Sequence, residues 1–360
     1  MTGREQVTSG SGDLGRYVLA GDYSISRIIQ GGWQFSSGHR LTAEGLDDAL
    51  EVLVRSADLG LTTFDCADIY SGVEELYGRF ITRWKSTSHA APLQIHTKFV
   101  PDYSTLDRVD RAYVERSVNR SLSRLGVDRL DLVQYYWWRD DVPGMEEAVG
   151  WLGDLQAAGK IRHVAATNMS VDRLRRIEDA GIRIVADQVQ YSALDRRPEA
   201  GLAEHASSTG MRLLSYGTLA GGFLTDRWLE SNEPSDLANR SLVKYRLIID
   251  EFGGWAPFQR LLGELGEIAR ECGVDLATVA LRFVLDQPHV AAVIVGATKV
   301  GQMERNVRAL AFTLSATDHA RIRRHVDAAP GPLGEVFGLE RDRDGPHGRI
   351  MRYDLNSEAS

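Results

Sequence analysis

Cysteine is scarce in this chain. Its 360 residues contain only Cys66 and Cys272, so the sequence supports neither a disulfide framework nor a cysteine-rich zinc site. The H-E-x-x-H spacing that holds zinc on a helix is also absent. These absences predict a cytoplasmic, metal-free protein.

Long apolar runs and an excess of positive charge are missing as well. No apolar stretch approaches the about 20 residues that a membrane-spanning helix needs, which argues against a membrane protein. The chain has 42 Lys and Arg against 50 Asp and Glu, a net charge of −8. Without a basic stripe to attract phosphates, we expect no nucleic-acid partner.

The beginning of the chain lacks the apolar core of a secretory signal. Residues 1–15 are rich in Ser, Thr and Gly, and we expect them to form a flexible tail. The run GSGDLG at 10–15 fits the G-x-G-x-x-G pattern of dinucleotide binding. That pattern carries meaning only after a strand, and no strand is expected here, so we assign no function to it.

The sequence does contain a regular alternation of short β-rich runs and amphipathic helices. Residues 46–57, for example, place Leu46, Leu50 and Leu53 on one helical face, and Gly60 follows as a helix stop. The expected strands start near residues 28, 62, 93, 131, 162, 184, 212 and 291.

Eight strands that alternate with helices predict an α/β fold, the (β/α)8 or TIM barrel. We expect residues 16–360 to form this one domain, and a doubly wound open sheet is the alternative. The wide gap before the last strand predicts a long loop after the seventh strand, at about residues 217–256. In a barrel, reactive side chains gather where the strands end, so those ends are where chemistry is expected.

Asp65 and Tyr70 follow the second strand, Lys98 ends the third, and Tyr136 ends the fourth. A tyrosine has a pKa near 10, and a neighbouring ammonium favours its phenolate form. The aspartate would keep that lysine charged. Such a group makes a tyrosine general acid that protonates a carbonyl oxygen as hydride arrives. The alternative is a buried Asp–Lys pair with only a structural role.

The other strand ends are polar but uncharged. Thr167, Asn168, Gln188 and Tyr216 offer amides, a hydroxyl and a flat ring, which suit a carboxamide-bearing ring. After the eighth strand, Lys299 stands at the start of a helix, where backbone N–H groups attract phosphate. Ordinary strand-end hydrogen bonds and a capped surface helix are the alternatives.

These strand ends, in this order, resemble the aldo-keto reductase superfamily. The motifs that carry the resemblance are GGWQ at 31–34, TFDCADIY at 63–70, HTKF at 96–99, SLSRLGVDRLDLVQ at 121–134, GKIRHVAATN at 159–168, DQVQYSALDRR at 187–197 and YGTLAGGFLT at 216–225. The closing RDGPHGRIMRYDLN at 343–356 resembles one bacterial and fungal branch, whose fourth strand usually reads like FHWW.

The resemblance implies an enzyme that uses NADPH/NADP+, with NADPH preferred over NADH, and a small-molecule carbonyl substrate. It makes Tyr70 the proton donor, and Asp65 and Lys98 the pair that adjusts the pKa of Tyr70. Tyr216 would stack on the nicotinamide, and residues 217–222 would fold over the pyrophosphate. The implied cofactor positions are Gly32, Trp33, Asp65, Thr167, Asn168, Gln188, Tyr216, Gly217, Thr218, Leu219, Gly221, Gly296, Lys299, Gln302 and Asn306. The implied substrate wall is Trp33, Trp137, Trp138 and a C-terminal loop.

One departure from the family pattern stands at Tyr136, where the family has its fourth catalytic residue, a histidine. A phenol still donates a hydrogen bond, but it is larger than an imidazole and carries no positive charge. We therefore weigh three functions. The first is reduction of a ketone or aldehyde. The second is ene reduction or redox-coupled elimination in a biosynthetic pathway, and the third is a non-catalytic NADPH-binding subunit. A sugar, a polyketide ketone and a simple aldehyde all fit the first.

Overall fold

The computed structural model describes residues 15–36, 43–87, 91–237 and 239–356. Of the expected tail, residues 1–14 lie outside the described residues.

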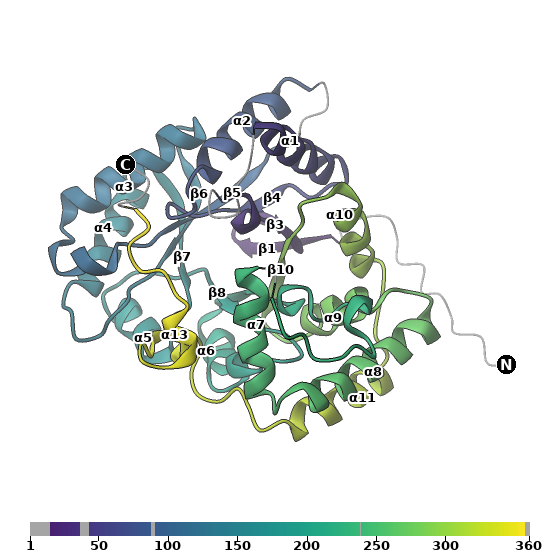
Figure 1. Cartoon of the computed structure of the whole chain (residues 1–360). Coiled ribbons are helices and arrows are strands. Elements are labelled where there is room, and N and C mark those ends of the chain that lie inside the picture. The colour runs from purple at the N-terminus through teal and green to yellow at the C-terminus, as the bar shows by residue number, and fades with distance from the viewer. Residues whose placement is uncertain (1–14, 37–42, 88–90, 238, 357–360) are drawn as a thin grey trace.

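Eight parallel strands close into a barrel at the centre of the molecule (Figure 1). They are β3 (Ile28–Gly31), β4 (Thr63–Asp65), β5 (Gln94–Phe99), β6 (Leu130–Tyr135), β7 (Ile161–Thr167), β8 (Ala186–Gln190), β9 (Arg212–Tyr216) and β10 (Val290–Gly296). The barrel closes where β10 pairs with β3, with Val293 opposite Ile28 and Gly296 opposite Gly31. The predicted barrel and its eight strands are confirmed.

Helices surround the barrel, as the apolar periodicity predicted (Figure 1). They are α1 (Ala43–Asp58), α2 (Val73–Lys85), α3 (Arg111–Leu125), α4 (Met145–Ala157), α5 (Val171–Asp179), α6 (Leu202–Thr209), α8 (Trp255–Cys272), α9 (Leu276–Leu285), α10 (Val300–Asn306) and α11 (Ala316–Ala328). Gly126 ends α3 in the left-handed conformation, with φ of 64°, which a residue without Cβ adopts at little cost.

An antiparallel hairpin, β1 (Arg16–Ala20) and β2 (Tyr23–Ser26), precedes the barrel and was not predicted. Tyr23 and Ile25 pack with Ile29 and Leu132 in a small apolar cluster. The Tyr23 hydroxyl lies 3.0 Å from His96 Nε2, and burial lowers the pKa of His96 to about 4. His96 is therefore a neutral residue that packs inside the barrel, below the strand ends.

The long segment after β9 and the C-terminal segment both carry short helices. The first contains η5 (Ala220–Gly222), η6 (Asp226–Trp228) and α7 (Arg240–Glu251), and the second contains α12 (Gly338–Arg341) and α13 (Pro346–Arg349). Residues 353–356 then run beside the residues that follow β5, because Tyr103 N donates to Tyr353 O at 2.9 Å and Asn356 N to Asp102 Oδ1 at 2.8 Å. The C-terminal segment thus spans the distance from α7 to the β5 end of the barrel.

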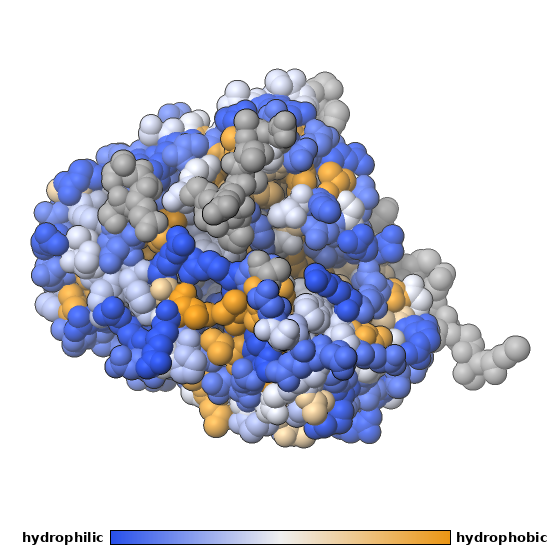
Figure 2. All heavy atoms as spheres, viewed as in Figure 1, coloured by the Kyte–Doolittle hydropathy of each residue, from blue (hydrophilic) through white to orange (hydrophobic). Residues whose placement is uncertain are grey.

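The apolar core fills the barrel and the layer between strands and helices. The face in Figure 2 is largely hydrophilic, and its apolar areas are small and separate. Among the described residues the exposed large apolar side chains are Val18 and Leu333. No helix in the described part of the chain is long and apolar enough to cross a membrane.

Candidate active site

Lys98 and Asp65 form a buried ion pair at the ends of β5 and β4. Lys98 Nζ donates to Asp65 Oδ2 at 2.7 Å and to Cys66 O at 2.8 Å, and the two charged side chains are 5% and 4% exposed. Burial alone would lower the pKa of Lys98, but the neighbouring Asp65 and Tyr70 raise it above its ordinary value. The lysine is therefore held in its charged form.

The other oxygen of Asp65 is held from two further strands. Asp65 Oδ1 accepts from Gln134 Nε2 at 2.8 Å and from Gln188 Nε2 at 2.7 Å. Gln188 Nε2 also lies 2.6 Å from Gln134 Oε1. Gln188 was expected at the nicotinamide carboxamide, and in this structure its amide nitrogen belongs to the network around Asp65.

Tyr70 lies against this pair. Lys98 Nζ is 5.1 Å from the centre of the Tyr70 ring, and the Trp33 ring meets the Tyr70 ring edge-on at 5.0 Å. Burial raises the pKa of the Tyr70 hydroxyl above 10, and the charge of Lys98 opposes that shift. The charge of Lys98 therefore acts in the expected direction, and burial of the hydroxyl outweighs it.

Tyr136 follows β6 and is buried. Its ring packs edge-on against Trp138 at 4.8 Å and Phe337 at 5.9 Å. Its hydroxyl oxygen has no hydrogen-bond partner within the described ranges. Burial raises the pKa of Tyr136, so the hydroxyl keeps its proton and is free to donate it in a hydrogen bond.

The two tryptophans after Tyr136 have different surroundings. Trp138 donates from Nε1 to Pro101 O at 2.7 Å and packs with Tyr353 of the C-terminal segment. Trp137 is fully buried, donates to Val142 O at 3.2 Å and packs against Tyr135. Trp137 was expected in the substrate wall; the structure instead places it in the layer beside α4, because neighbouring positions of an extended segment point to opposite faces.

The predicted amide positions form one connected group. Thr167 Oγ1 donates to Gln188 O at 3.1 Å, and Asn168 takes the left-handed conformation with φ of 56°. Asn168 Oδ1 accepts from the Tyr216 hydroxyl at 2.9 Å. The structure therefore brings the predicted stacking ring and the predicted carboxamide residues together.

The loop after β9 is tight because it lies against Tyr245 of α7. Gly217 and Gly221 have φ of 70° and 64°. A Cβ on Gly217 would overlap the Tyr245 hydroxyl, and one on Gly221 would lie 2.7 Å from the Tyr245 ring. Leu219 is half-buried, whereas Thr218 is buried and its hydroxyl has no partner among the residues described.

The remaining cofactor positions lie at β3, β10 and α10. A Cβ on Gly32 would lie 2.7 Å from Val73, and one on Gly296 would overlap the Gln34 side chain. Lys299 is exposed, whereas Asn306 is buried. Gln302 Oε1 accepts from Thr298 N at 2.9 Å and from Lys299 N at 3.1 Å, which is the capping arrangement weighed as an alternative.

The sequence model of the Aldo/keto reductase family matches residues 27–327. The chain belongs to the aldo/keto reductase family. Its members are NADP-dependent oxidoreductases, so the predictions of family and enzyme class are confirmed.

Relatives of this aldo/keto reductase include Protein tas of Escherichia coli, which is 32% identical over 58% of this chain and 64% of that protein. The match therefore spans somewhat less than two thirds of that relative. L-glyceraldehyde 3-phosphate reductase of E. coli is 27% identical over 86% of this chain and 92% of its own. The solved structure of a Klebsiella pneumoniae aldo/keto reductase in complex with NADP and acetate has a TM-score of 0.65 at 23% identity, over 87% and 94% of the two chains.

Sequence reasoning missed a group of residues that this aldo/keto reductase brings to Tyr136 from the C-terminal segment. Arg341 donates to Asn168 O, and its guanidinium carbon lies 5.8 Å from the centre of the Tyr136 ring. Phe337 packs on the same ring. The sequence shows that the run GLERDRDG at 338–345 is rich in charged residues. Nothing in the neighbouring sequence indicates which of these side chains contacts the barrel.

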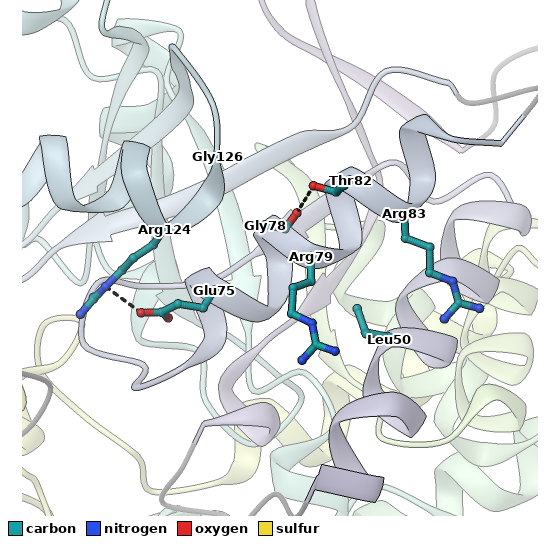
Figure 3. A pocket seen from close by; sticks show the side chains of 8 residues that line it. All are labelled: Leu50, Glu75, Gly78, Arg79, Thr82, Arg83, Arg124 and Gly126. Carbon is teal, nitrogen blue, oxygen red and sulfur yellow. Dashed lines mark hydrogen bonds and ion pairs between the residues drawn. The ribbon is translucent and has the colours of Figure 1, made fainter.

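A separate hollow of about 590 Å³ lies between α1, α2 and α3 (Figure 3). Its lining includes Glu75, Arg79, Arg83 and Arg124. Arg83 is paired with Glu51 at 3.1 Å, and none of the predicted site residues lines this hollow. It therefore takes no part in the candidate active site.

Proposed function

We propose that this chain reduces a ketone or an aldehyde to an alcohol, with NADPH as cofactor and Tyr70 as general acid. The observation that carries the proposal is the buried Lys98–Asp65 pair beside Tyr70. An Asp–Lys pair with only a structural role would not require the Tyr70 ring beside Lys98. The third function weighed, a non-catalytic subunit, offers no reason for that arrangement.

The residues present fit a nicotinamide cofactor. The Thr218 hydroxyl is buried without a partner in the described structure, in the loop that the resemblance assigns to the pyrophosphate. Tyr216 would carry the nicotinamide ring, Asn168 and Thr167 would hold its carboxamide, and Lys299 would meet the 2′-phosphate. When bound, NADPH supplies the hydride that adds to the carbonyl carbon.

The chain's own residues would handle the proton. Tyr70 Oη would give its proton to the carbonyl oxygen as that oxygen gains negative charge, and solvent would later restore it. Lys98 stabilises the phenolate left behind, and Asp65 keeps Lys98 charged. Tyr136 Oη would donate a second hydrogen bond to the same oxygen, in the place of the family's histidine.

Replacement of Tyr70 by Phe tests the assignment of the acid. We expect kcat for carbonyl reduction to fall by about 10²–10⁴, since that is the usual contribution of a general acid. NADPH affinity, followed by fluorescence titration, should change little. Tyr113→Phe is the matched control, because Tyr113 lies on α3 against Phe99. Retention of most of the activity in Tyr70→Phe would refute the role of Tyr70.

Ene reduction is the second candidate, and the neutral, buried Tyr136 favours it. Without an imidazole, less polarisation reaches a carbonyl oxygen, and a conjugated double bond competes for the hydride. An enone substrate distinguishes the two outcomes: an allylic alcohol supports carbonyl reduction, and a saturated ketone supports ene reduction. Tyr136→His should shift the product ratio toward the allylic alcohol.

A further inference from the structure

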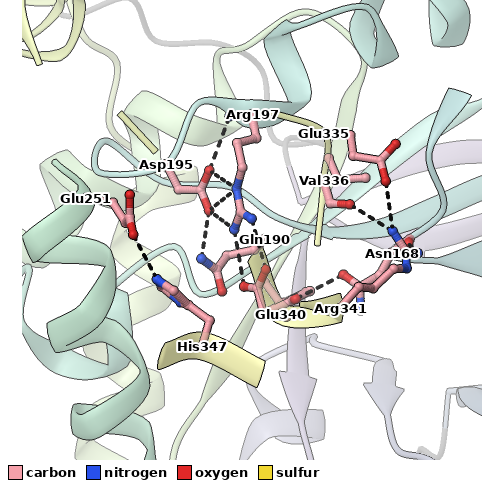
Figure 4. Close-up of polar contacts among 11 residues, drawn as sticks. Asn168, Gln190, Asp195, Arg197, Glu251, Glu335, Val336, Glu340, Arg341 and His347 are labelled. Atoms are coloured by element: carbon pink, nitrogen blue, oxygen red, sulfur yellow. Dashed lines mark hydrogen bonds and ion pairs between the residues drawn. The ribbon is translucent and has the colours of Figure 1, made fainter. Parts of the chain in front are cut away.

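Arg341 reaches the active site because the helix that carries it is fixed by a buried ion group (Figure 4). Glu340, the preceding residue, pairs with Arg197 at 2.9 and 3.2 Å, and Arg197 pairs with Asp195 at 2.7 Å. All three side chains are at most 1% exposed. The position of Arg341 at the end of α12 is therefore set by the fold.

The guanidinium of Arg341 is only partly satisfied. One Nη donates to Asn168 O, and the other donates to Val336 O at 3.3 Å and lies 3.4 Å from the carboxylate of Glu335, which is 54% exposed. Arg341 Nε is buried and has no partner within the described structure, and the same holds for Tyr136 Oη. The Tyr136 oxygen can accept as well as donate, but Arg341 Nε can only donate. A buried donor without an acceptor is costly, so Arg341 Nε indicates a missing acceptor.

A second basic side chain, Lys244, lies near the same Phe337 ring. The guanidinium carbon of Arg341 is 5.8 Å, and Lys244 Nζ is 5.6 Å, from the centre of the Phe337 ring. Lys244 Nζ is also 5.0 Å from the Tyr216 ring, and no ion pair of Lys244 occurs among the described residues. Phe337 itself takes the left-handed conformation, with φ of 60°, a strained position that must be held by its surroundings.

The two cations differ in their compensation. Lys244 faces the buried group in which two carboxylates, Asp195 and Glu340, share Arg197, whereas the carboxylate beside Arg341 is the exposed Glu335. Glu340 is committed to Arg197, and Asp140 is paired with Arg173 at 2.7 Å. Burial raises the pKa of Asp187 well above its usual range.

We propose that Arg341 binds a carboxylate of the substrate, one or two bonds away from the carbonyl that is reduced, so that the substrate class is the oxo-carboxylic acids. This inference rests on the proposed function. The small distance between acid group and carbonyl follows from the contacts of Arg341, since it bonds Asn168, a predicted cofactor residue, and lies over Tyr136. Arg341 Nε, the guanidinium nitrogen left without a partner in the described structure, suits one oxygen of a small anion.

A matched pair of substrates tests the proposal. Benzoylformate carries a carboxylate beside its ketone, and methyl benzoylformate is the neutral ester with the same skeleton. For the wild type we expect kcat/KM for the acid to exceed that for the ester at least tenfold. Arg341→Gln should lower kcat/KM for the acid about 10²-fold, mainly through KM, and should leave the ester within about threefold.

Arg343→Gln is the control variant. Arg343 is exposed, and its guanidinium carbon lies 4.4 and 4.8 Å from the ring centres of Tyr103 and Tyr353. Its replacement should therefore change kcat/KM little for either substrate. An equal loss on acid and ester in Arg341→Gln would show that Arg341 acts only on the fold, and would overturn the proposal. Lys244→Met should also lower kcat/KM for benzoylformate. If it lowers the affinity for NADPH instead, Lys244 belongs to the cofactor site.

A binding measurement separates this proposal from the proposed function. Calorimetric titration of benzoylformate into the wild-type and Arg341→Gln complexes with NADP+ needs no turnover. Tighter binding to the wild type by about 10²-fold supports the carboxylate site even if neither ketone is reduced. Equal affinities would refute it even if other carbonyl compounds are reduced.

Discussion

Asp65 is the residue on which the candidate site depends most. It receives one lysine and two glutamine side chains, from β5, β6 and β8, at 2.7–2.8 Å. A buried carboxylate is tolerated only when its oxygens are satisfied in this way. The cluster therefore links the order of the strands around the barrel to the protonation state of Lys98.

Gly217 is a residue whose replacement should be costly for a steric reason. Gly217→Ala combines positive-φ strain with overlap of Tyr245, whereas Gly222→Ala has φ of 103° and open space around the new Cβ. We expect Gly217→Ala to lose about 1–3 kcal/mol more stability than Gly222→Ala, as overpacking usually does. Urea unfolding of both variants measures the difference, and equal losses would rule out the clash with Tyr245.

At the scale of single elements, α12 is too short to fold by itself, and its place is set by Glu340. Burial alone would raise the pKa of Glu340, but the charges of Lys244 and Arg197 lower it to about 2. Because the folded pKa is below the unfolded value of 4.5, the stabilisation is present above pH 4.5 and is lost as the pH falls toward 2.

Glu340→Gln should therefore destabilise the protein at neutral pH and lessen its sensitivity to acid. We expect a loss of about 3 kcal/mol at pH 7, since breaking a buried ion pair leaves Arg197 undercompensated. The difference from wild type should shrink below pH 4.5. Glu335→Gln, on an exposed partner of Arg341, is the control and should cost no more than about 1 kcal/mol. Denaturant unfolding at several pH values checks both, and a pH-independent difference would contradict the pKa argument.

At the scale of the whole molecule, the cofactor should stabilise the closed barrel. A ligand that binds only the folded state adds about 2.7 kcal/mol at a hundred times its Kd, so NADPH should raise Tm by several degrees. NADH at the same concentration should raise Tm less, because Lys299 would meet only the 2′-phosphate of NADPH. Lys299→Met should reduce that difference, with Arg308→Met, an exposed cation of η7 (Val307–Leu310), as the control. Equal shifts for both nucleotides in the wild type would contradict the preference.

The barrel was predictable because its signals are local. Each strand and helix shows its own periodicity and stops, as at Gly126, and eight repeats leave few architectures. The hairpin β1–β2 lacked such a repeat, and its role depends on Tyr23 meeting His96, a contact between residues 73 positions apart.

The positions of the side chains at the strand ends could likewise be predicted, because each one follows a strand with a clear sequence pattern. The sequence predicts Asp65, Tyr70, Lys98 and Tyr136 at the strand ends of one barrel mouth, and in the structure Lys98 Nζ lies 2.7 Å from Asp65 Oδ2. The direction of a side chain just past a strand was harder to read. Trp137 was expected at the mouth and lies beside α4, since the pattern of four aromatic residues is apolar on both faces.

The sequence by itself determined the barrel, the family and the chemistry available at the strand ends, because strand and helix periodicity and short motifs are properties of neighbouring residues. Only the tertiary structure decided the pKa direction of Tyr70, the meeting of Arg341 with Tyr136, and the crowding of Gly217 by Tyr245. Those outcomes depend on burial and on contacts between distant segments. The C-terminal segment shows the difference most clearly, since its charges are plain in the sequence but only the Glu340–Arg197 pair fixes which of them reaches the barrel mouth.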